Sequence, residues 1–115
     1  CNTEGCENVA MGLQAMRFNT TGDFNTAIGT KALCKNTTAN NNTAVGFNSL
    51  NANTTGVNNT AVGECAGKLL TTGSYNVAIG NCALYSETKA KNNKIYFMDI
   101  NIKKILGFHL QFVLF

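Results

Sequence analysis

The stretch Asn-Thr-Ala-Val-Gly at positions 42–46 recurs unchanged at 59–63, and as Asn-Val-Ala-Ile-Gly at 76–80. Two further copies, at 8–12 and 25–29, stand at the same interval of 17 residues, with no insertion or deletion between copies. Residues that return at a fixed period occupy equivalent environments in a stacked structure. The sequence therefore predicts a repeat array over residues 1–92, with coils starting at Asn8, Asn25, Asn42, Asn59 and Asn76.

The period and the composition of the repeat favour β-structure. Helical-hairpin repeats need about 33 residues or more, and Gly, Thr and Asn are poor helix formers. Within a coil, the five-residue motif is typical of a short strand ended by Gly, the following Ala-Leu pair of a second short strand, and Asn-Thr-Thr-Gly of a turn. We predict an all-β fold, a parallel β-solenoid or β-roll with 17-residue coils.

In such a stack every repeat position becomes a ladder. Adjacent strand residues face opposite sides, so an alanine column that fills the coil interior leaves the next, apolar column pointing outward. The ladders are Ala10, Ala27, Ala44, Ala61 and Ala78; Met11, Ile28, Val45, Val62 and Ile79; and the glycines Gly29, Gly46, Gly63 and Gly80. A fourth apolar column, at Met16, Leu33, Leu50 and Leu84, is interrupted by Gly67.

The outward apolar column bears on the oligomeric state. Each such side chain is worth about 1.5–3 kcal/mol when buried, and a soluble monomer does not leave a continuous apolar stripe exposed. We expect other copies to cover it, in a homotrimer of three parallel chains side by side. The alternative is a wider monomeric coil that bends between the two columns, so that both point inward.

The asparagine and threonine columns have their own interpretations. We expect the five motif asparagines to form a structural ladder in which stacked side-chain amides bond along the solenoid. Two adjacent threonine columns admit an alternative function, an ice-binding face, although Thr-Thr-Gly is also ordinary turn chemistry. Those columns are Thr20, Thr37, Thr54 and Thr71, beside Thr21, Thr38, Thr55 and Thr72.

Composition and charge exclude several function classes. Charged residues make up 13% of the chain, too few for a disordered polyelectrolyte. Residues 1–86 carry no net charge and the +3 lies in 87–115, so the array offers no nucleic-acid footprint. The chain has a single histidine, His109, and no carboxylate pair by column, so we expect no enzyme activity and no cofactor or metal. No apolar run reaches the roughly 18 residues of a membrane span.

Two features stand apart from the repeat. Residues 93–115 break the pattern at Lys94–Phe97 and become apolar, which predicts a C-terminal cap or a joint to the next protein. Among the five cysteines only Cys65 and Cys82 share a column, and their spacings match no zinc motif. A disulfide between them is geometrically allowed but is not favoured over two reduced thiols.

The repeats at 42–46, 59–63 and 76–80 resemble the head repeats of trimeric autotransporter adhesins. The fuller pattern, with Asn-Thr-Thr-Gly between Ala-Leu and the next Asn-Thr-Ala-Val-Gly, is similar to repeats of phage and large-virus tail-fibre proteins. The resemblance covers residues 2–92. It implies a trimeric fibre or adhesin shaft that is extracellular, on a cell surface or virion, and that spaces or presents a part binding a host receptor or glycan.

Overall fold

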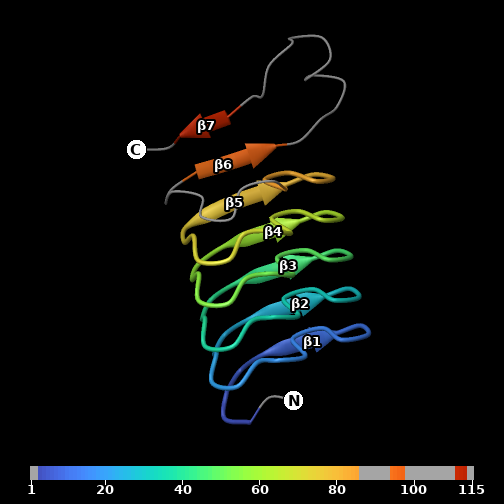
Figure 1. The fold of residues 1–115 in the computed structure, drawn as a ribbon, viewed down its shortest axis with the longest axis vertical. Coiled ribbons are helices and arrows are strands. Elements are labelled where there is room, and N and C mark those ends of the chain that lie inside the picture. The colour runs from blue at the N-terminus through green and yellow to red at the C-terminus, as the bar shows by residue number, and fades with distance from the viewer. Residues whose placement is uncertain (1–2, 86–93, 98–110, 114–115) are drawn as a thin grey trace.

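The structure, a computed structural model, describes residues 3–85, 94–97 and 111–113. They form seven strands: β1 (Val9–Met11), β2 (Thr26–Ile28), β3 (Thr43–Val45), β4 (Thr60–Val62), β5 (Asn76–Ile79), β6 (Lys94–Phe97) and β7 (Gln111–Val113). Figure 1 shows the strands stacked in sequence order, and from β1 to β5 each strand is reached from the one before by one turn of the coil. The described residues contain no helix, and the all-β solenoid predicted from the repeat is confirmed.

The coils stack with the predicted period. Strands β1 to β5 are parallel, and each residue pairs with the residue 17 positions later, as Ala27 does with Ala44 and Ala44 with Ala61. The same register holds from β1 to β2 and from β4 to β5. A constant register places each repeat position next to the same position of the neighbouring coil. A residue type that recurs every 17 residues in the sequence therefore forms a ladder along the stack.

The prediction of a second strand at the Ala-Leu pair is wrong. Residues 12–18 and their equivalents form successive turns, in which Ala15 N–H donates to the Gly12 carbonyl and Arg17 N–H to the Gln14 carbonyl. Two non-glycine residues of this segment have left-handed φ in each of the first three coils, for example Lys31 (60°) and Leu33 (49°). The segment still bonds to the next coil, because Leu33 N–H reaches the Ser49 carbonyl at 3.0 Å.

The core is a narrow column of small and branched side chains. The middle residues of β2, β3 and β4 are fully buried; they are Ala27, Ala44 and Ala61. From the turn segment, Leu33 and Leu50 belong to the same core. Ala10, which belongs to the same column, is exposed, and the described residues include no complete coil beneath β1. The interior is narrow enough that alanine fills it from one side and leucine from the other.

The register changes at the last strands. Strand β6 pairs parallel with β5, but Ala78 lies opposite Tyr96, a separation of 18 residues rather than 17. Strand β7 then pairs antiparallel with β6. The sheet therefore continues beyond residue 92, and the cap-or-joint role of 93–115 stays a prediction, since 86–93, 98–110 and 114–115 lie outside the described residues.

Candidate functional site

The motif asparagines line up in single file and bond from side chain to backbone. The Oδ1 of Asn25 accepts the backbone N–H of Asn42 at 2.9 Å, and the Oδ1 of Asn42 accepts that of Asn59 at 2.9 Å. The bonds from Asn8 to Asn25 and from Asn59 to Asn76 are equivalent. The ladder differs from the predicted one, in which side-chain amides bond to one another. Most of these side chains instead accept a hydrogen bond from the main chain of the next coil. Among the five motif asparagines only Asn76 also donates its Nδ2 to an amide oxygen, that of Asn59.

A second asparagine ladder runs beside the first and was missed by the sequence reasoning. In this ladder the amides do bond to one another: Asn36 Nδ2 donates to Asn19 Oδ1 at 2.8 Å, and Asn53 Nδ2 to Asn36 Oδ1 at 3.1 Å. All three side chains are fully buried. The recurrence of Asn at an interval of 17 was visible, but these positions also begin Asn-x-Thr sequons and turn motifs.

The two ladders meet on the same backbone carbonyls. The Gly56 carbonyl accepts Asn42 Nδ2 at 2.8 Å and Asn53 Nδ2 at 2.9 Å. The carbonyls of Gly22 and Ala39 are used in the same way. The turns at Gly22, Ala39 and Gly56 are therefore each held by one amide from each ladder, which satisfies buried polar groups that would otherwise be costly.

The fourth coil exchanges two residues of this arrangement. Where the coil below has Leu50 and Asn53, it has Gly67 and Leu70, and Leu70 is fully buried in the asparagine column. A Cβ added at Gly67 would lie 2.9 Å from Leu50 Cδ2. Because leucine offers no donor, the buried Oδ1 of Asn53 has no hydrogen-bond partner among the described residues.

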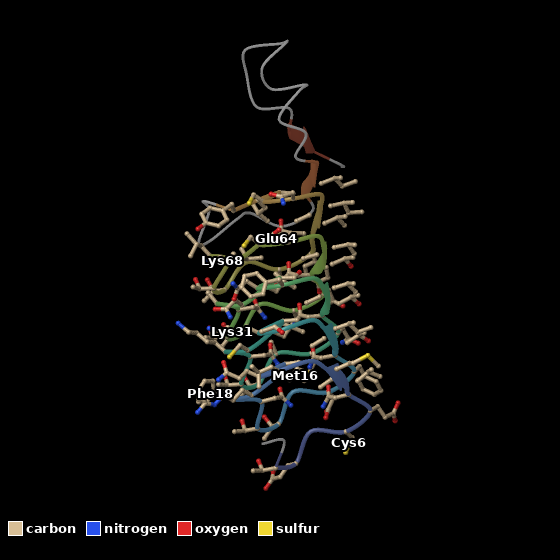
Figure 2. The ribbon with its side chains drawn as sticks, turned by 90° about the vertical axis from the view of Figure 1, so that its right-hand side faces the viewer. Cys6, Met16, Phe18, Lys31, Glu64 and Lys68 are labelled. Carbon is tan, nitrogen blue, oxygen red and sulfur yellow. The ribbon has the colours of Figure 1, made fainter. Side chains whose placement is uncertain are left out.

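The outer side of the sheet carries two columns that flank the buried alanines. One is the predicted apolar column, with Met11 64%, Val62 38% and Ile79 40% exposed and Ile28 and Val45 half-buried. The other comprises Val9, Thr26, Thr43, Thr60 and Val77. Figure 2 shows side chains standing along the outer side of the strands at successive levels of the stack. In this chain the two predicted columns face opposite sides, so the arrangement with both pointing inward does not occur.

The glycine column is fixed by close packing of main chains. Gly29, Gly46, Gly63 and Gly80 have φ between 116° and 132°. A Cβ at Gly46 would lie 2.6 Å from the Gly63 carbonyl oxygen, which is too close for any side chain. These glycines end each strand and let the chain turn toward the interior.

The threonine columns of the alternative interpretation lie in the turns. The hydroxyl of Thr20 donates to the Thr37 carbonyl at 3.0 Å, that of Thr37 to Thr54 at 3.3 Å, and that of Thr54 to Thr71 at 3.1 Å. The first column is half-buried from Thr37 onward, and the second is exposed. The hydroxyl protons of Thr20, Thr37 and Thr54 are therefore committed within the solenoid. The sequence reasoning did not single out the strand threonines, although they too recur at intervals of 17.

No three His, Cys, Asp or Glu side chains among the described residues lie close enough to hold a metal ion. Burial raises the pKa of the Cys65 thiol, against the opposite effect of the Lys68 ammonium. His109 lies outside the described residues.

The searched part of the chain holds no helix that is long and apolar enough to cross a membrane. Comparison with known proteins gives no assignment: no family model, no curated protein and no solved structure matches this chain.

Proposed function

We propose that this protein is a structural shaft element of a surface fibre or adhesin, extracellular on a cell or a virion. Three copies pack side by side through the outer face of the sheet, and the resulting rod spaces or presents a receptor-binding part. The observation that carries the proposal is that face: its apolar column runs through all five coils in constant register, while the alanines behind it are buried from Ala27 onward.

The ladders support the mechanical part of the proposal. Consecutive coils are joined by main-chain bonds at the strands, at the turn segment and at the Thr-Thr turns, and by both asparagine columns. No long flexible loop separates one described coil from the next, because the strands of β1 to β5 begin about every 17 residues. A chain bonded along its whole length in this way resists bending, which is the property that a fibre shaft requires.

The outer face supports the trimeric part. Burying a fully exposed Met, Val or Ile side chain contributes about 1.5–3 kcal/mol, and Met11, Val62 and Ile79 contribute the share of it that corresponds to their remaining exposure. A straight apolar ladder along the stack matches the same ladder of a parallel copy, and closed cyclic symmetry leaves no such face exposed. Contacts with other fibre or capsid proteins through 93–115, and with a host receptor or glycan, belong to the same proposal.

The test is the oligomeric state in solution, measured by light scattering after gel filtration and by chemical cross-linking. The wild type is expected to be a trimer, and Val45→Lys, at the middle of the outer face, a monomer with unchanged far-ultraviolet circular dichroism. Thr55→Lys, an exposed turn position, is the matched control and should remain trimeric. A monomeric wild type at micromolar concentration, or a trimeric Val45→Lys, would contradict the proposal.

A second candidate function is ice binding. The threonines of the strands support this function better than the threonines of the turns do. Thr26, Thr43 and Thr60 stand in one register column on the outer face, and Ile28, Val45 and Val62 follow two residues on. The regularly spaced methyl and hydroxyl groups on this sheet are the groups that would contact an ice surface. This use requires the face to be free, so it predicts a monomer with thermal hysteresis, and absence of hysteresis at millimolar protein would end it.

A further inference from the structure

The fourth and fifth coils carry a column of two cysteines that has no part in the proposed fibre function. Cys65 and Cys82 occupy the same repeat position in the fourth and fifth coils, which are paired in register at Val62 and Ile79. Each uses its backbone N–H in the same way, donating to the coil below: Cys65 to the Phe47 carbonyl at 2.8 Å, and Cys82 to the Glu64 carbonyl at 2.8 Å.

The two cysteines have nearly the same backbone φ, 57° at Cys65 and 56° at Cys82. Neighbouring strands of a parallel stack lie about 4.8 Å apart, and disulfides span Cα separations of roughly 4.4–6.8 Å. The coils are held together beyond the pair as well, because Gly67 N–H donates to the Ala83 carbonyl at 2.8 Å.

We propose that Cys65 and Cys82 are a dithiol site that takes a disulfide oxidant of the glutathione class and closes to a coil-to-coil disulfide. The other described cysteines have no such partner. In the next coil, the position of Cys6 is occupied by Asp23 and that of Cys34 by Asn51. The site would tie the fourth coil to the fifth, directly beneath β6.

The exposure of the two thiols sets the order of the chemistry. Cys82 is half-exposed and Cys65 is buried, and hydrogen bonding between the two thiols is among the causes, after burial, that raise the pKa of Cys65. The Cys82 thiolate attacks one sulfur of oxidised glutathione, forms a mixed disulfide and releases one glutathione thiolate. Cys65 then loses its proton to water and attacks Cys82 Sγ, which breaks the bond to the second glutathione. The two cysteines lose two electrons and two protons, and one glutathione disulfide becomes two thiols.

The sequence makes the link easy to detect. Trypsin cleaves after Lys35, Lys68 and Lys89, so Cys65 lies in peptide 36–68 and Cys82 in peptide 69–89, while Cys34 falls in 32–35. The folded full chain is incubated with oxidised glutathione, quenched with acid, alkylated and digested without reduction. We expect peptide 36–68 joined to 69–89 in a protein that still has the mass of one chain. We also expect a higher thermal unfolding temperature than that of the reduced protein, reversed by dithiothreitol.

Single variants separate the two roles. Cys65→Ser should leave glutathione attached at Cys82, Cys82→Ser should leave Cys65 reduced, and Cys34→Ser should keep the link. A persistent mixed disulfide at Cys82 in the wild type, an unmodified pair while exposed Cys6 reacts, or a link between two chains would each overturn the proposal. The wild-type peptide map decides the question even where a variant fails to fold, and its readout is independent of trimer formation.

Discussion

Removing one amide from the middle of the motif ladder should cost more than removing one from its end. In Asn42→Ala the buried N–H of Asn59 loses its acceptor, the Asn42 Oδ1 at 2.9 Å. The Gly56 carbonyl loses Asn42 Nδ2 but keeps Asn53 Nδ2 at 2.9 Å. The variant therefore leaves one buried donor without a partner and one acceptor with a single remaining bond.

The magnitude follows from that difference. An orphaned buried N–H costs about 1–3 kcal/mol and a lost amide hydrogen bond about 1 kcal/mol, so Asn42→Ala should lower the free energy of unfolding by roughly 2–4 kcal/mol. Asn76→Ala is the matched control from the same column, also buried. Asn76→Ala loses two Nδ2 bonds, to the Asn59 Oδ1 and to the Ser74 carbonyl, but it orphans no buried N–H among the described residues and removes a buried Oδ1 that has no partner there. It should therefore cost about 1–2 kcal/mol less than Asn42→Ala.

Urea unfolding followed by circular dichroism measures both values. Protein concentration must be held equal, because assembly would stabilise the folded state by mass action. Equal m-values would show that the two variants unfold over the same surface. If Asn76→Ala is as destabilising as Asn42→Ala, the ladder does not act by satisfying the next coil's main chain, and the reasoning is refuted.

Three further outcomes are expected. Leu70→Asn alone should destabilise, since it restores a donor to Asn53 Oδ1 but removes a buried leucine from the coil that carries the small Gly67, whereas Gly67→Leu combined with Leu70→Asn should recover part of the loss by restoring buried apolar volume in that coil; an additive double-mutant cycle would contradict this. Gly46→Ala should lose at least about 2 kcal/mol or fail to fold, because φ of 129° and a Cβ contact at 2.6 Å both oppose a side chain; a variant of wild-type stability in urea would show that the glycine is dispensable. As the pH rises through the ordinary thiol pKa of 9.0, the reduced protein should lose stability that Cys65→Ala does not lose, because the unfolded thiol ionises there while the folded one keeps its proton; urea midpoints across that pH range check the sign.

The sequence by itself determined the 17-residue coil and which strand residues point into the interior or outward. Five copies of the motif at one interval fixed where each strand lies, and strand alternation then placed Ala44 inside and Val45 outside. These features follow from local rules, because every coil repeats the same short-range pattern and an in-register parallel stack satisfies all copies at once.

The tertiary structure decided what local propensity could not. Leu33 and Leu50 adopt left-handed φ because bonds to the next coil and burial offset a conformation that leucine avoids on its own. The backbone role of Asn42 and the amide-to-amide role of Asn36 depend on which groups of the neighbouring coil lie opposite, and both residues look alike in sequence. Tertiary structure also decided the one-residue shift in the register of β6, because the register of a strand depends on the strand with which it pairs.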